Sequence, residues 1–138
     1  MGVTLQWSGL NEFKEALRQL PEHLADEAGD IVIAAAEGAA TTVQANYPSR
    51  SGNLKRGVSV SRQRSRASTS ARVKSGAPHA VIFEKGTGIR QNRRGANRGR
   101  MPKAPDSQAM IPTVIRARAR MLASLIALLE REGFQVSR

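Results

Sequence analysis

One stretch between two prolines constrains the fold more than any other part of the chain. Between Pro21 and Pro48, apolar residues recur every three or four positions, which is the period of one face of an α-helix. The members of this stripe are Leu24, Ala28, Ile31, Ala35, Ala39 and Val43. The pattern predicts a long helix over residues 22–46, and its many alanine residues would let a neighbouring element approach closely.

The region after this helix alternates in the way that β-strands do. Val58 and Val60 alternate with polar residues, as do Ala71 and Val73, and a polar turn over residues 66–69 separates the two runs. This pattern predicts an antiparallel hairpin with one apolar face. We expect the other face to be basic and to carry Arg62, Arg64, Arg72 and Lys74. The short apolar run over residues 80–83 fits either a buried strand or one helical turn.

The last third of the chain predicts a second long helix, over residues 107–132. Its expected buried stripe is Ile111, Ile115, Leu122, Leu125 and Leu129. Pro112 fits only in the first turn or at a kink, and Gly133 is typical of a helix end.

Shorter signals lie near the two termini of the chain. Residues 3–7 read as a strand, and residues 8–20 read as a short helix with Leu10 and Phe13 at helical spacing. Residues 134–136 fit a closing strand. At 138 residues the chain has the length of a single domain, 1–138. The expected fold class is α+β: a small, mostly antiparallel sheet with a basic hairpin, packed on two long helices and carrying a long basic loop.

Charge is distributed very unevenly along the chain. The chain holds 22 Lys and Arg residues against 11 Asp and Glu residues, which gives a net charge of +11. Residues 1–49 contain seven acids and two bases, whereas residues 50–103 contain fifteen bases and the single acid Glu84. A molecule with an acidic first third and a basic middle can attract copies of itself as well as nucleic acid.

The stretch over residues 86–106 has no periodic apolar pattern. Its arginines are Arg90, Arg93, Arg94, Arg98 and Arg100. With little to bury, the segment should be flexible alone and become ordered only on assembly. Three interpretations stay open: a solvated loop, a contact to a phosphate backbone, or ordering against an acidic neighbour. No aromatic residue interleaves with the arginines, so any nucleic-acid contact would involve the backbone and not stacked bases.

The sequence offers little material for catalysis, and we expect no enzyme, cofactor or metal. There is no cysteine, and His23 and His79 are isolated from other metal-ligating side chains. Gly86-Thr87-Gly88 lacks the lysine of a phosphate-binding loop. The absence of a long apolar run and of a signal sequence predicts a soluble intracellular protein without membrane contact. No small-molecule substrate is indicated either.

Four short motifs together resemble a known family. They are Asn46-Tyr47-Pro48, the run from Ser51 to Arg56, the run from Ala80 to Thr87, and Ala109-Met110-Ile111-Pro112. In this order and spacing they resemble the "gene product ten" tail-component family of long-tailed bacteriophages, whose members are also described as neck or tail-completion proteins. Phe83-Glu84-Lys85-Gly86-Thr87 is the most specific part of the likeness.

The resemblance implies a non-enzymatic virion protein at the head–tail junction, assembled in the host cytoplasm. It would form a homo-oligomeric ring, for which a hexamer is one form, between the head connector and the tail around the DNA passage. Its partners would be neighbouring neck and tail-terminator or tail-tube proteins, with unspecific contact to packaged DNA. The alternative is a small non-specific nucleic-acid-binding protein.

The residues expected to face a neighbouring subunit, a docking partner or DNA lie in the signature turn and the basic loop. They are Glu84, Gly86, Thr87, Arg90, Arg93, Arg94, Arg98, Arg100 and Lys103. For Glu84 two interpretations stay open. One is a local ion pair with Lys85 or a hairpin arginine, and the other is an inter-subunit salt bridge.

Overall fold

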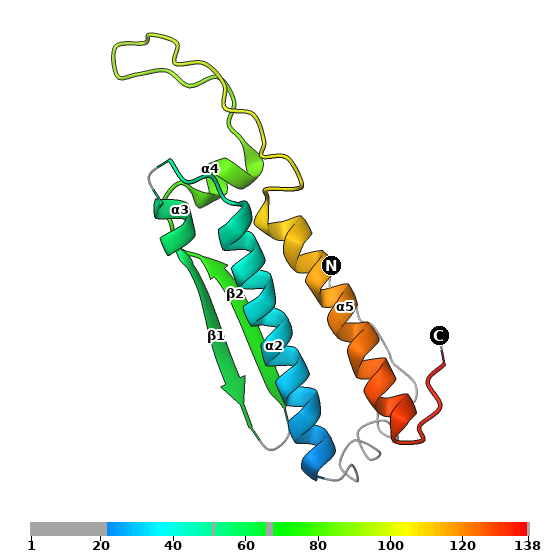
Figure 1. Cartoon of the computed structure of the whole chain (residues 1–138). Helices are drawn as coiled ribbons and strands as arrows, with labels where there is room; N and C mark the ends of the chain where they lie inside the picture. Colours follow the sequence, from blue (N-terminus) through cyan, green and yellow to red (C-terminus); the bar gives the residue numbers. More distant parts are fainter. Residues whose placement is uncertain (1–21, 51, 66–67, 138) are drawn as a thin grey trace, which may run out of the picture.

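The computed structural model describes residues 22–50, 52–65 and 68–137 and has an α+β fold (Figure 1). The described helices are α2 (Glu22–Asn46), α3 (Asn53–Arg56), α4 (Ala80–Lys85) and α5 (Met110–Arg131). The strands are β1 (Val58–Arg64) and β2 (Thr69–Ser75). The strand and short helix predicted over residues 3–7 and 8–20 lie outside the described residues.

Helix α2 forms the middle of the molecule, with the β1–β2 hairpin packed on one side and α5 on the other (Figure 1). It spans the residues that the sequence predicts, and Leu24, Ala39 and Val43 of its stripe are buried. Its small residues allow close packing. A Cβ at Gly29 would lie 2.8 Å from the Thr69 hydroxyl of the hairpin.

The two strands pair in antiparallel register, with Val60 opposite Val73 and Arg62 opposite Ala71. Residues at even positions of β1 therefore share one face, and this face carries Arg62 and Arg64 as well as the valines. The predicted single basic face is wrong in this respect. Arg72 and Lys74 lie on the opposite face. Side chains two positions apart along a strand share a face, so Arg62 and Arg64 lie on the same face as the valines of β1 and reach α2.

Helix α5 contacts α2 through a different face from the predicted one. Thr113, Ala117 and Leu128 are buried, whereas Ile111, Ile115 and Leu122 of the predicted stripe are 50%, 62% and 48% exposed. Where α5 faces α2, the lining consists mainly of small residues, among them Ala35 and Ala39 of α2 and Ala117 of α5. Leu125 and Leu129 are half-buried.

Helix α5 begins three residues later than predicted, at Met110, and ends at Arg131, one residue before the predicted end. Pro112 lies in its first turn, where a missing N–H leaves no hydrogen bond unmade. Gly133 follows the helix with φ of +88°, and its N–H donates to the Glu130 carbonyl. Residues 134–136 join no strand ladder, so the predicted closing strand is wrong. In the described structure no sheet edge pairs with that segment.

The principal hydrophobic core lies at one end of the molecule, where α2 ends. Its buried members are Ala40, Val43, Tyr47, Leu54, Val58 and Ala80. The run over residues 80–83, which fitted a strand or a helix, forms helix α4, with Ala80 and Glu84 facing this core. From the same end, residues 86–106 project as an arm beyond the helices (Figure 1).

Candidate functional site

The most unusual polar group of the described chain is the buried carboxylate of Glu84. Only 8% of this residue is exposed, although it lies in the most basic part of the sequence. Its Oε1 accepts hydrogen bonds from the Tyr47 hydroxyl at 3.4 Å and from the backbone N–H of Met110. Its Oε2 accepts one from the N–H of Ile111 at 3.5 Å.

These contacts make Glu84 the acceptor for the beginning of α5. Ala109 occupies the N-cap position and supplies no side-chain acceptor for the first free N–H groups of the helix. A carboxylate there satisfies those donors and interacts favourably with the positive end of the helix dipole. The carboxylate therefore accepts hydrogen bonds within its own chain, and none of the described ion pairs joins it to Lys85 or a hairpin arginine. The inter-subunit salt bridge stays a prediction.

Tyr47 couples this carboxylate to the core. Its ring packs edge-on against Phe83, with centroids 5.4 Å apart. Burial raises the pKa of the Tyr47 hydroxyl, the Ser75 hydroxyl partly offsets that effect, and the negative charge of Glu84 adds to the rise. Tyr47, Glu84 and Met110 come from three of the motifs that carry the family resemblance, so these motifs meet at one place.

Gly86 and Thr87 form the foot of the arm. Gly86 has φ of +71° and ψ of −172°, a conformation that only glycine adopts readily. A Cβ there would lie 2.7 Å from both the Lys103 nitrogen and the Met101 oxygen. The Thr87 N–H donates to the Met101 carbonyl at 2.8 Å, and the Thr87 hydroxyl accepts from the Met101 N–H at 3.1 Å. The two limbs are thus joined where the arm leaves α4.

Beyond its foot, the arm pairs with itself through backbone hydrogen bonds. Gln91 and Asn97 form an antiparallel bridge, and the Arg90 N–H donates to the Gly99 carbonyl at 3.1 Å. At the tip the Asn92 side chain accepts from the Ala96 N–H at 2.8 Å. The expected loop without pattern is therefore a paired ribbon. Its order comes from backbone groups and asparagine turns, which leave no apolar periodicity in the sequence.

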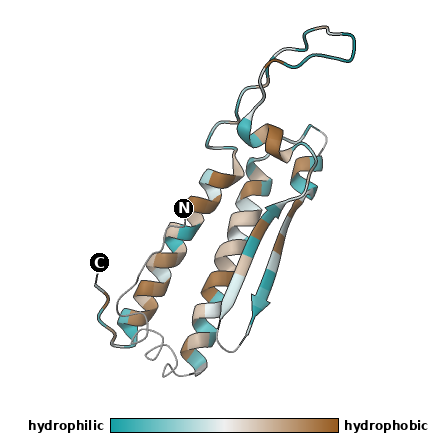
Figure 2. Cartoon of the chain, turned by 180° about the vertical axis from the view of Figure 1, so that it is seen from behind, coloured by the Kyte–Doolittle hydropathy of each residue, from teal (hydrophilic) through white to brown (hydrophobic). Residues whose placement is uncertain are grey.

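The arm concentrates positive charge that the described part of the molecule does not compensate. Its exposed arginines, none of which forms an ion pair with a described residue, are Arg90, Arg93, Arg94, Arg98 and Arg100. Lys103, nearer the foot, lies 3.6 Å from Asp106. The arm is largely hydrophilic, and α4 at its foot is largely hydrophobic (Figure 2).

The arginines of β1 have the opposite surroundings. Arg64 lies 2.9 Å from Asp30 and 3.2 Å from Asp26, and Arg62 pairs with Glu37. The hydrogen bond to Asp30 raises the pKa of Arg64. These acids of α2 therefore form ion pairs within the chain. The attraction between copies that the charge distribution suggested stays a prediction.

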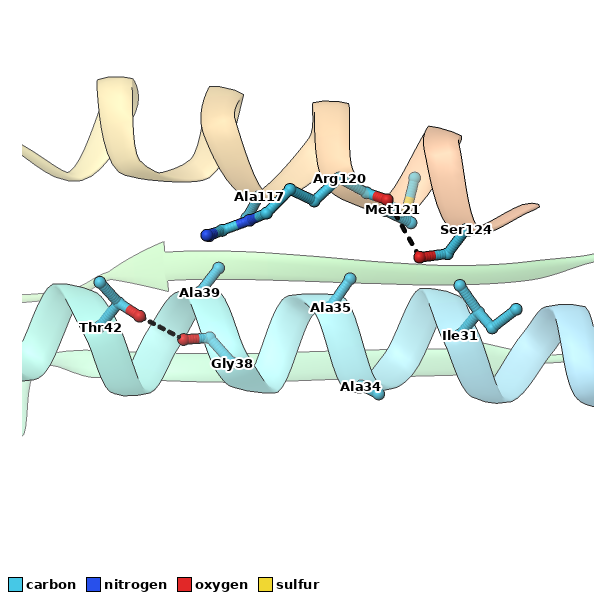
Figure 3. A pocket seen from close by; sticks show the side chains of 10 residues that line it. All are labelled: Ile31, Ala34, Ala35, Gly38, Ala39, Thr42, Ala117, Arg120, Met121 and Ser124. Carbon is cyan, nitrogen blue, oxygen red and sulfur yellow. Dashed lines mark hydrogen bonds between the residues drawn. The ribbon is translucent and has the colours of Figure 1, made fainter. Parts of the chain in front are cut away.

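An open groove of about 400 Å³ runs between α2 and α5 (Figure 3). Its walls are mainly small apolar residues, with Arg120 as its charged side chain. The Thr42 and Ser124 hydroxyls donate to carbonyls of their own helices, to Gly38 at 2.8 Å and to Arg120 at 3.1 Å. The lining offers no paired acid and base, so the groove is best described as the seam between two helices.

Among the residues that the structure describes, no three His, Asp or Glu side chains come together as metal ligands would. In the same residues, no helix is both long and apolar enough to cross a membrane.

The part of the chain that ends with α4 matches a known protein family. Residues 11–86, more than half of the chain, match the family described as "Bacteriophage HK97-gp10, putative tail-component". The chain belongs to this family. The resemblance to this family is thereby confirmed, and the family description is consistent with a structural protein of the phage particle. No curated protein and no solved structure matches the chain.

The family match covers α2, the hairpin and α4, and it ends at Gly86. This is the residue at which the arm begins. The arm and α5 lie beyond the matched residues, so their use has to be argued from their own geometry and charge.

Proposed function

We propose that this tail component is a neck or tail-completion subunit that joins the head connector to the tail around the DNA passage. The observation that carries the proposal is the arm at the end of a family fold. It projects from the body, its foot is fixed at Gly86, and its five arginines have no partner among the described residues. Within the fold they have no structural task, which leaves them for an external contact.

The proposal includes a ring of identical subunits, for which a hexamer is one form, docked on neighbouring neck, tail-terminator or tail-tube proteins. The acids of α2 pair with Arg62, Arg64 and Arg131 of the same chain. Contacts between subunits would therefore not depend mainly on attraction between the acidic first third of one chain and the basic middle of the next. A ring requires two different surfaces that fit each other. The arm, from Gly86 and Thr87 to Lys103, is the part that extends toward the next component.

Interrupting the reading frame in the phage that encodes this chain tests the proposal. Electron microscopy should then reveal DNA-filled heads and separate, complete tails, and supplying the chain in trans should restore joined particles. Joined particles formed at the normal yield without the chain would contradict the proposal. Heads without DNA would also contradict it, because they would assign the chain to an earlier step.

A second function is favoured by the same arginines: unspecific binding to duplex DNA. Clustered arginines bind a phosphate backbone by releasing counterions, and affinity then falls steeply with salt, with a slope of about 0.9 per phosphate contacted. An electrophoretic shift with a 30-base-pair duplex at several salt concentrations measures this slope. If DNA binding is the main function, the isolated subunit should bind the duplex strongly at physiological salt.

A further inference from the structure

We propose that the arm-bearing end binds a different protein, whose surface presents an apolar recess surrounded by carboxylates. This inference rests on the proposed function and names the chemistry of the partner at the arm. It starts from a feature that neither the ion pairs nor the core explains. Large apolar side chains lie exposed where the arm leaves the body.

This apolar patch consists of four residues from α4 and the foot of the arm. They are Val81, Ile82, Ile89 and Met101. Val81 is 66% exposed and Ile89 is 70% exposed. Helix α4 turns Ala80 and Glu84 inward, so Val81 is left on the outer side. Exposed apolar side chains gathered on a small protein mark a surface that a partner covers.

Hydrogen bonds hold the two parts of the patch at one junction. Met101 pairs with Thr87, which is two residues before Ile89 in the extended limb. The Ala104 N–H donates to the Phe83 carbonyl at 3.1 Å, so the returning limb of the arm passes along α4. The patch is therefore part of a fixed surface, and binding there does not have to order the foot of the arm first.

The surroundings of the patch are positively charged. Arg90 directly follows Ile89 in the arm, and Arg100 directly precedes Met101. The acids nearby are already used, because Glu84 is buried against the beginning of α5 and Asp106 pairs with Lys103. An apolar centre with a charged rim is the usual composition of a protein–protein interface, in which arginine is enriched. The complementary surface has an apolar recess and acidic surroundings.

A second copy of the chain and duplex DNA fit that surface less well. Among the residues that the structure describes, Asp26, Asp30 and Glu37 of a copy are paired with its own arginines, so these three acids are already used. Duplex DNA would satisfy the arginines, but its phosphate backbone would leave Val81 and Ile89 in water. A heterologous acidic protein satisfies both the apolar and the charged parts.

The test uses trans complementation of the interrupted phage with the full chain. The apolar variant is Val81→Ser with Ile89→Ser, and the single change Ile89→Ser avoids any effect on α4. Phe134→Ser, an exposed apolar residue after α5, is the matched control. The fraction of joined particles should fall about tenfold or more for the apolar variant. The control should join heads to tails like the natural chain.

Two further measurements separate the other partners. The apolar variant should shift a 30-base-pair duplex like the natural chain, and light scattering should give both proteins the same mass in solution. Joining restored by both Val81→Ser/Ile89→Ser and Ile89→Ser would overturn this proposal alone. A loss of self-association in these variants would overturn it in favour of a second copy. Joined particles formed without any chain would overturn the proposed function and this inference together.

Discussion

Arg64 and Arg94 belong to the same basic stretch of sequence, but Arg64 is the last residue of β1 and Arg94 belongs to the arm. The end of β1 and the arm lie at opposite ends of the molecule (Figure 1). Arg64 is held by Asp26 and Asp30 of α2, so it helps to attach the hairpin. Arg94 lies at the tip of the arm, exposed and without an ion-pair partner among the described residues. Net charge along a sequence therefore overestimates the charge that is free for a partner.

Glu84 lies where the arm joins the body, and its substitution should have the largest effect on stability. Glu84→Ala leaves the Tyr47 hydroxyl and the first N–H groups of α5 without their acceptor. The free energy of unfolding, measured with urea, should fall by about 2–4 kcal/mol. Glu84→Gln keeps one acceptor oxygen and should lose less. Equal stability of Glu84→Ala and the natural chain would contradict the assigned role.

Gly86→Ala tests whether the foot of the arm is fixed. The alanine would adopt a strained backbone, at a cost of about 1–3 kcal/mol, and its Cβ would contact backbone atoms of Met101 and Lys103. Gly88→Ala is the control, because no atom lies within 4 Å of a Cβ at that position. Hydrogen exchange should increase at Thr87 and Met101 in Gly86→Ala only. Unchanged protection would mean that the foot does not depend on this glycine.

The pH dependence at Tyr47 tests the core beneath the arm. Because burial and Glu84 raise the pKa of the hydroxyl, the folded chain keeps this proton at a pH where the unfolded chain has lost it. The contribution to stability is complete below the unfolded pKa of about 10 and is lost as pH rises above it. Tyr47 is the one tyrosine of the chain, so phenolate absorbance reports it directly. Titration at about 10 in the folded protein would contradict this.

Arg64→Ser should have a smaller effect, because the pair with Asp26 and Asp30 is exposed to solvent. We expect a slight fall in the midpoint of thermal unfolding at low salt. The difference should disappear at high salt, since salt screens exposed pairs. Arg72→Ser, on the other face of the hairpin, is the control and should not change the midpoint at either salt concentration.

The long elements were predictable from the sequence, whereas the pairing of polar groups was not. The apolar period and the flanking prolines predict α2 with its correct bounds, and alternation predicts the hairpin. The predicted buried face of α5 was wrong in part, since Ile111, Ile115 and Leu122 are exposed whereas Thr113, Ala117 and Leu128 are buried. The prediction of a single basic face of the hairpin was also wrong. Side chains alternate between the two faces of a strand, and the register places the arginines of β1 and the basic residues of β2 on opposite faces.

The role of Glu84 had a weak signal in the sequence. The single acid of a basic stretch stands two residues before Gly86, and α5 begins at Ala109-Met110 without a local capping side chain. An uncapped helix requires an acceptor from elsewhere, but only the fold brings residues 84 and 110 together. The paired arm carried no periodic signal, because asparagine turns and backbone hydrogen bonds hold it together.

The central claim is that the arm arginines serve a partner and not the fold. The most direct test replaces all five, Arg90, Arg93, Arg94, Arg98 and Arg100, by serine and measures unfolding and head–tail joining on the same variant. The account predicts an unchanged unfolding midpoint together with a loss of joined particles in the complemented phage. A lowered midpoint, or joined particles at the normal yield, would contradict it.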